Sequence, residues 1–179
     1  MFFIKNILYI NQNNMGTTSA VANEFLKLSE DSKLHITNMK LVSMMYIAQG
    51  LSLSLLERPL FNDDNIEAWK YGPVIPSIYN EFKHFKSSHI TSKSVVTGNN
   101  WKSFLEPQLV NIEDKKVVKL TWNLYREVSA EELATSTHRS GTPWSFTYSP
   151  YENNIISNDL IKKYYDKFVN NLQSYLKSA

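Results

Sequence analysis

Hydrophobic residues recur along much of this chain at intervals of three and four, the spacing of a helix with one buried face. The clearest case follows Thr37, a residue type that caps helix N-termini well. We predict a helix from Thr37 to about Leu55. It must pass through Gly50, where glycine costs about 1 kcal/mol relative to alanine, so Gly50 marks either close packing or a bend. The apolar stripe that carries this prediction is Leu41, Met44, Met45 and Ala48.

Two shorter helices are predicted on either side of this segment. The first runs from Ser19, its expected cap, to about Leu28, with Val21 and Phe25 on the same face as Leu28. The second begins at Pro76, because a residue without an N–H loses no hydrogen bond in the first turn of a helix. Its stripe consists of Ile78, Tyr79, Phe82 and Phe85.

Three more helices are expected in the C-terminal part. One spans about 113–128 and starts with acidic residues, as the helix dipole favours. Ser129 and Glu132 have the spacing of a capping box, which opens the next helix. Ser157 is expected to cap the last helix, whose wide stripe predicts packing on the core over most of its length. The two stripes are Val117, Leu120, Leu124 and Val128, then Leu160, Ile161, Tyr164, Tyr165, Phe168, Val169 and Leu172.

The segments between these helices are less regular. Residues 59–65 form a loop, and residues 87–111 have no clear period. Short strands are expected at Val95-Val96 and Leu109-Val110, separated by a turn at Gly98-Asn99-Asn100. The predicted fold is therefore mainly α, a compact single-domain helical bundle with long loops and room for one small β-hairpin.

The N-terminal residues differ in character from the rest. The first ten are apolar like a targeting sequence, but Lys5 interrupts the run and no small-residue cleavage site follows. We treat residues 1–16 as an N-terminal extension ahead of a helical domain formed by residues 17–179. Residues 1–14 fit an upstream translation start before Met15 and an ordered first strand about equally well.

Composition excludes several kinds of chemistry. The 179 residues include no cysteine, so disulfides, thiolate metal sites and cysteine nucleophiles are ruled out. The net charge of +2 favours no nucleic-acid partner unless the basic residues cluster. No run approaches the roughly 18 apolar residues that span a bilayer. We expect a soluble, cytoplasmic protein with no membrane partner.

The residues that could carry catalysis or bind metal are scattered. None of the four histidines, His35, His84, His89 and His138, has a second ligand at helical spacing, so we expect no metal and no cofactor. There is no Gly-x-Ser-x-Gly elbow and no glycine-rich phosphate loop. The basic residues form no continuous stripe, which makes direct nucleic-acid binding unlikely. These absences favour a protein that is not an enzyme.

Two segments fit neither an ordinary helix nor an ordinary loop. Residues 67–76 place Trp69 and Tyr71 around a lysine, and Gly72-Pro73 then forces an extended or strongly turned backbone. Residues 137–144 end in Pro143-Trp144. Tryptophans in such places more often anchor a core than contact a ligand, and His138 more often pins a turn than acts as a base.

These segments, in this order and spacing, resemble the Panacea antitoxin domain family. The resemblance covers roughly residues 18–168 and is most specific in the Ala-Trp-x-x-Gly-Pro-Val block. In the early helix the sequence departs from the family pattern, with Val42 in place of a glutamine and Ser43 in place of a lysine. The other matching segments are Ala20 to Leu26, Ile36 to Leu41, Met45 to Gly50, Pro59-Leu60-Phe61, Ser129 to Leu133, and His138 with Pro143-Trp144.

The resemblance implies a function without catalysis. Panacea proteins are antitoxins that bind and neutralise a toxin encoded beside them, and one branch delivers its toxin to a cytoplasmic ATP-dependent protease. On this interpretation Trp69, Gly72 and Pro73 mainly shape the domain, while Lys70 and the helix face of Ser43 select the partner. The full set of signature or partner-binding candidates is Lys40, Ser43, Tyr46, Trp69, Lys70, Tyr71, Gly72, Pro73, Tyr79, His138, Pro143 and Trp144.

Two other functions remain open at this point. The slightly basic balance and the paired helices suit a small DNA-binding transcriptional regulator of its own operon. A small hydrolase would need His138 as its base. The sequence identifies neither the toxin nor the oligomeric state.

Overall fold

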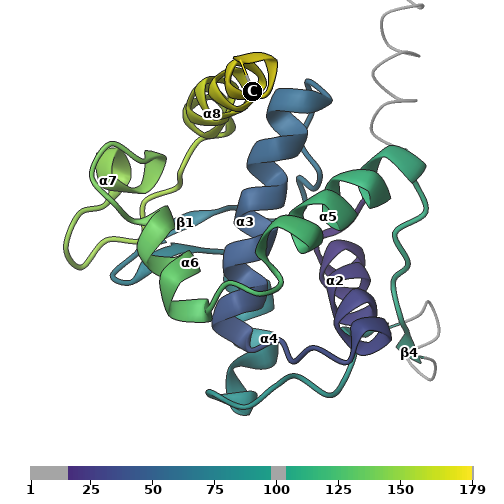
Figure 1. Ribbon diagram of the computed structural model, residues 1–179. Coiled ribbons are helices and arrows are strands. Elements are labelled where there is room, and N and C mark those ends of the chain that lie inside the picture. Colours follow the sequence, from purple (N-terminus) through teal and green to yellow (C-terminus); the bar gives the residue numbers. More distant parts are fainter. Residues whose placement is uncertain (1–15, 98–103, 179) are drawn as a thin grey trace, which may run out of the picture.

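Helix α3 (Asn38–Leu55) runs through the middle of the fold, with the other long helices packed around it (Figure 1). Fifteen of its 18 residues are buried, so it is enclosed on nearly every side. This computed structural model describes residues 16–97 and 104–178, with side chains described as far as residue 174. The remaining helices are α2 (Thr18–Ser32), α4 (Pro76–Phe82), α5 (Ile112–Tyr125), α6 (Ala130–Thr137), α7 (Pro143–Thr147) and α8 (Asn158–Ser178), with a 3-10 turn at Lys83–Phe85.

The fold is mainly helical, as the sequence predicts. Thr37 caps α3 by accepting a hydrogen bond from the backbone N–H of Lys40. The capping box of Ser129 and Glu132 is formed at the start of α6. Helix α2 begins slightly earlier than expected, because Thr17 rather than Ser19 provides the capping oxygen.

Two antiparallel strand pairs accompany the helices. Strands β1 (Glu67–Trp69) and β2 (Gly72–Val74) form a hairpin, and β3 (Val96–Thr97) pairs with β4 (Phe104–Leu105). The prediction of a strand at Leu109-Val110 is wrong. Leu109 is instead 2% exposed and packs against Gly16, where an added Cβ would lie 2.4 Å from its side chain. The predicted turn at residues 98–100 and the extension over residues 1–15 lie outside the described residues.

The buried face of α5 also differs from the prediction. Leu120 and Leu124 are 40% and 46% exposed, and the helix ends at Tyr125 rather than Val128. Trp122 is 2% exposed and lies on the inward face of α5, the helix that packs on α2 and α3. With Trp122 on the inward face, Leu120 and Leu124 lie on the outward side. The buried residues are Asp114, Val117, Val118, Thr121 and Trp122.

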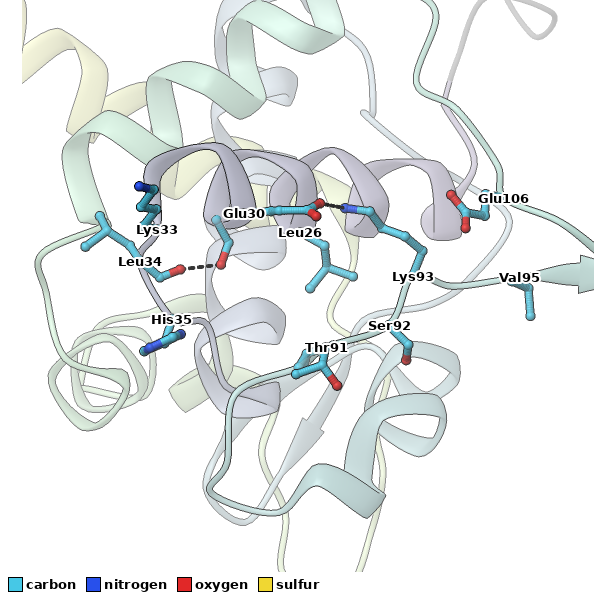
Figure 2. Close-up of a pocket in the computed structure, with 12 residues that line it drawn as sticks. Leu26, Glu30, Lys33, Leu34, His35, Thr91, Ser92, Lys93, Val95 and Glu106 are labelled. Carbon is cyan, nitrogen blue, oxygen red and sulfur yellow. Dashed lines mark hydrogen bonds and ion pairs between the residues drawn. The ribbon is translucent and has the colours of Figure 1, made fainter.

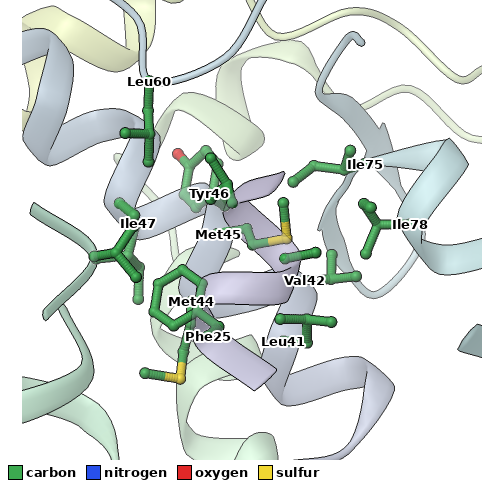
Figure 3. Close-up of a cluster of buried hydrophobic side chains, with 14 of the residues drawn as sticks. Phe25, Leu41, Val42, Met44, Met45, Tyr46, Ile47, Leu60, Ile75 and Ile78 are labelled. Carbon is green, nitrogen blue, oxygen red and sulfur yellow. The ribbon is translucent and has the colours of Figure 1, made fainter. Parts of the chain in front are cut away.

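A continuous hydrophobic core lies between α2, α3 and the segment around β2 and α4 (Figure 3). The polar side chain of Gln49 is buried within this core, and both the oxygen and the nitrogen of its amide form hydrogen bonds. Its Oε1 accepts from the backbone N–H groups of Leu60 and Phe61, and its Nε2 donates to Phe61 O and Asn158 Oδ1. Gln49 therefore fixes the loop after α3 and the start of α8 to the same helix.

Helix α8 packs on the core along one side at least as far as Val169. Ile161 and Tyr165 are buried and Val169 is partly buried against the core, whereas Phe168 and Leu172 are 37% and 43% exposed. The buried side of α8 is therefore narrower than the predicted stripe. Gly50 makes the contact possible, because a Cβ there would lie 2.2–2.6 Å from ring atoms of Tyr165. Close packing, rather than a bend, explains this glycine. None of the helices in the described part of the chain is long and apolar enough to cross a membrane.

Candidate functional site

The first signature segment folds into the β1–β2 hairpin, with Lys70 and Tyr71 as its two-residue turn. Gly72 has φ +131°, a backbone conformation that residues with a Cβ rarely adopt. The outer edge of β1 is covered by a distant segment, since Ala68 N–H donates to Asn154 O at 2.8 Å. Strand β2 is thus an edge strand, where the missing N–H of Pro73 is tolerated.

A hydrogen bond joins the two signature segments. The indole Nε1 of Trp144, at the start of α7, donates to the carbonyl oxygen of Trp69 at 2.7 Å, across 75 positions of sequence. The indole of Trp69 donates in turn to Glu67 Oε2 at 2.7 Å. Both tryptophans are half-buried. The hairpin and α7 are therefore held to each other by a specific polar contact.

Aromatic rings extend this contact on both sides. Tyr79 meets Trp69 edge-on with centroids 5.1 Å apart, and Tyr148 stacks on Trp144 at 4.6 Å. His138 meets Trp144 edge-on at 5.4 Å. We call these five residues the aromatic junction. Such arrangements add about 0.5–1.5 kcal/mol per pair beyond area burial, so the junction stabilises the attachment of the hairpin to α6 and α7.

His138 has a packing role in this geometry. Its Nδ1 is buried, and within the described residues no side chain forms a hydrogen bond with it. The same nitrogen would lie 3.8 Å from a Cβ placed on Gly72, so the ring closes over the hairpin. No three histidine, aspartate or glutamate side chains within the described ranges lie close enough together to hold a metal ion.

Replacing Trp144 with phenylalanine is expected to lower the free energy of unfolding by about 1–2 kcal/mol. The ring contacts are largely kept, but the hydrogen bond to Trp69 O is lost. Chemical denaturation measures the change. The matched control is Phe146→Leu, because that side chain on the same helix is 71% exposed and should tolerate the change. Equal stability of the Trp144 variant and the wild type would contradict the role of the indole.

The candidate residues of α3 are buried, contrary to the expectation that their face selects a partner. Lys40, Ser43 and Tyr46 are 8%, 6% and 1% exposed. Lys40 Nζ donates to the backbone oxygen of Arg126, the C-cap of α5, where a cation is favourable. Desolvation by burial lowers the pKa of Lys40, although nearby Glu127 opposes the shift. Because α5, α6 and α8 cover this face, it is part of the scaffold.

The turn of the hairpin is the exposed part of the first signature segment. Tyr71 is 72% exposed, and Lys70 Nζ lies 5.1 Å from the centroid of its ring. Tyr79 is 37% exposed, whereas Pro143 is buried in the first turn of α7. Gly72 and Pro73 are buried, as expected of residues that shape the domain, and Lys70 is exposed.

Four tyrosines, of which only Tyr46 is among the candidates from the sequence, surround a small cavity of about 150 Å³. We call this cavity, with Ser136, Thr137 and Thr142 also in its wall, the tyrosine chamber. The hydroxyl of Tyr46 is buried and has no hydrogen-bond partner within the described residues. Burial raises the pKa of each of three of its tyrosines, which are Tyr46, Tyr125 and Tyr165. The remaining tyrosine is Tyr164; the doublet Tyr164-Tyr165 was predicted only as core.

A separate groove of about 840 Å³ lies beside α2 (Figure 2). Its wall is mixed polar and apolar and includes the ion pair of Lys93 with Glu30, whose N–O distance is 3.2 Å. His35, at its end, stacks on His89 at 4.1 Å. None of the twelve signature candidates lines this groove.

The chain belongs to the family described as "Antitoxin SocA-like, Panacea domain", whose profile matches residues 41–145. Among curated proteins it is similar to "Antitoxin SocA" from Caulobacter vibrioides (strain NA1000 / CB15N), with 29% identity over 127 residues. That alignment covers 70% of this chain and 66% of the relative, just under two thirds of the relative's length. No solved structure matches the chain significantly. The resemblance to Panacea domains is thereby confirmed.

Proposed function

We propose that this chain is an antitoxin that neutralises a toxin encoded beside it by direct protein–protein binding, without catalysis. The observation that carries the proposal is the family match over residues 41–145, which includes both signature segments. The name of the relative, "Antitoxin SocA", supports the same role.

The roles of the signature residues agree with a binding protein. Trp69, Trp144 and His138 hold the two signature segments together, and the buried Nδ1 of His138 has no hydrogen-bond partner among the described residues, which supports a packing role for this ring. Side chains that hold a rigid scaffold let an interface form without a large loss of conformational entropy. The exposed surface around this scaffold is then free to vary with the partner.

Co-expression with the product of the adjacent reading frame tests the proposal. That product alone should arrest growth, and growth should return when this chain is also expressed. A purified mixture should co-elute as a complex in size-exclusion chromatography. The proposal fails if the adjacent product is harmless alone, or if it remains harmful although this chain is present and folded.

The abundance of the toxin during rescue distinguishes two forms of neutralisation. Sequestration leaves the toxin at a constant level in an inactive complex. Delivery to an ATP-dependent protease, the adaptor role that the Panacea resemblance includes, shortens the toxin half-life when this chain is present. A pulse-chase measurement with and without this chain therefore separates the two.

A further inference from the structure

A third hollow, of about 530 Å³, lies between α7 and the part of α8 from Leu160 to Asn171. We call it the α7–α8 groove. Its apolar wall is formed by Pro143, Phe146, Leu160 and Phe168. Phe146 is 71% exposed and Phe168 is 37% exposed. Large apolar side chains that gather in one open hollow mark an interaction surface more than scattered exposed residues do.

The apolar side chains of α8 form a stripe that suits a helical partner. Leu160, Tyr164, Phe168 and Leu172 follow one another at intervals of four, and the last of them is 43% exposed. Their spacing places them on one side of α8. The first three of these residues line the groove, and Leu172 lies one turn beyond it. A groove with such a wall accepts the apolar face of an amphipathic helix, which enters as a row of anchors at similar intervals.

The charged side chains of the groove all have the same sign. Lys163 and Lys167, one turn apart on α8, both line it, and no acidic side chain does. Both lysines are exposed, and neither forms an ion pair with the described residues, whereas their neighbour Lys162 contacts Glu57 and Asp166. Two unpaired cations beside an apolar surface favour a partner that carries acidic residues next to its apolar ones.

The groove adjoins the tyrosine chamber, because Tyr164 and Phe168 line both. The chamber therefore extends the aromatic wall of the groove toward α3, whose Tyr46 and Ile47 line it. The Tyr46 hydroxyl itself is closed to solvent, so it is not presented to a partner.

We propose that the α7–α8 groove is the docking site for an acidic amphipathic helix of the toxin. Phe146 and Phe168 contact the apolar face of that helix, and Lys163 and Lys167 pair with its acidic residues. This inference rests on the proposed antitoxin function, and it names the surface that carries that function.

Charge reversal on α8 tests the proposal. The double variant Lys163→Glu/Lys167→Glu should bind the purified product of the adjacent reading frame at least about tenfold more weakly in calorimetry. Its binding should also lose much of the salt dependence that the wild type shows. The matched control is Lys115→Glu/Lys119→Glu, with the same spacing and exposure on α5, which lies on the other side of α3 from α7 (Figure 1). The control should bind as the wild type does.

A second pair of variants tests the apolar part. Phe146→Ser should weaken binding by about tenfold or more, and Phe104→Ser on β4 is the matched control, because both phenylalanines are 71% exposed. Circular dichroism and a thermal melt verify that all four variants fold. Tyr46 is left unchanged in this test because it belongs to the core.

The outcomes separate the two levels of the proposal. If the wild type does not bind the adjacent product, the antitoxin function and the docking site both fail. If the wild type binds and rescues growth while the groove variants bind within twofold of it, the docking site is overturned and the function stands. If the purified chain is a dimer that Phe146→Ser converts to a monomer, the groove holds a second copy instead, which also overturns the proposal.

Discussion

Replacing Arg58 with methionine is expected to lower the free energy of unfolding by about 3 kcal/mol near pH 8. Arg58 Nη2 lies 2.6 Å from Oδ1 of Asp114, whose side chain is 0% exposed. Removing the cation leaves a carboxylate buried without its partner, and breaking such a pair typically costs about 3–5 kcal/mol. Arg58 itself is 24% exposed, so we expect the lower end of that range.

The size of this effect should depend on pH in a defined direction. Burial raises the pKa of Asp114 above its ordinary value, and the hydrogen bond and charge of Arg58 reduce that increase. A carboxyl with a raised folded pKa contributes stability below its unfolded pKa, and that contribution is lost as pH rises through the folded pKa. Without Arg58 the pKa rises further, so the deficit of the variant should be largest at pH 8 and shrink as the pH falls toward 5.

Urea denaturation at several pH values measures this prediction. The control is Arg58→Met/Asp114→Leu, which removes both charges and should recover much of the lost stability. A deficit of the single variant that stays constant from pH 8 to pH 5 would contradict the assignment of the loss to the Asp114 carboxylate.

Gly50→Ala is expected to destabilise the protein by about 2 kcal/mol, although alanine is the better helix former. The intrinsic gain in a helix interior is about 1 kcal/mol. Against it, the new Cβ would lie 2.2 Å from the nearest atom of the Tyr165 ring, and that tyrosine is 5% exposed. Overpacking of this kind costs about 1–3 kcal/mol or more, so the clash outweighs the gain.

The sign of the effect should reverse when the ring is removed. In a Tyr165→Ala background, Gly50→Ala should be neutral or stabilising by up to about 1 kcal/mol, because only the helix propensity remains. A double-mutant cycle in denaturant gives the coupling between the two positions. If Gly50→Ala is equally destabilising in both backgrounds, then the contact with Tyr165 is not the reason for the glycine.

The parts of the fold that depend on local sequence were predictable. The cap at Thr37, the capping box at Ser129 and the central stripe of α3 depend on residues within a few positions of one another. The change of chain direction near Gly72-Pro73 was also visible in the sequence, but the turn itself lies at Lys70-Tyr71 and Gly72-Pro73 belongs to β2, so the hairpin register needed the structure.

The parts that depend on distant contacts were not predictable. Leu120 and Leu124 have the right spacing for a buried face of α5, yet Trp122 and Asp114 occupy it, because Asp114 pairs with Arg58 from another segment. Lys40 was a signature or partner-binding candidate, but its partner is a backbone carbonyl 86 positions away. A single sequence does not contain these pairings in its local pattern.

The candidate site shows the same division. Both signature segments were visible as unusual turns, and their junction through Trp69 and Trp144 needed the structure. The groove lysines, Lys163 and Lys167, are not among the candidates from the sequence, because a hollow beside α7 leaves no local pattern on α8.

The backbone bonds around β1 also determine when the domain can be completed during synthesis. Ala68 N–H is bonded to Asn154 O, and Ile156 N–H is bonded to Ile66 O. Contacts so far apart in sequence form late, because a long loop must close first. The chain must leave the ribosome at least as far as residue 156 before strand β1 acquires its outer neighbour. A nascent or prematurely terminated chain that lacks residues 154–156 therefore cannot present the finished hairpin.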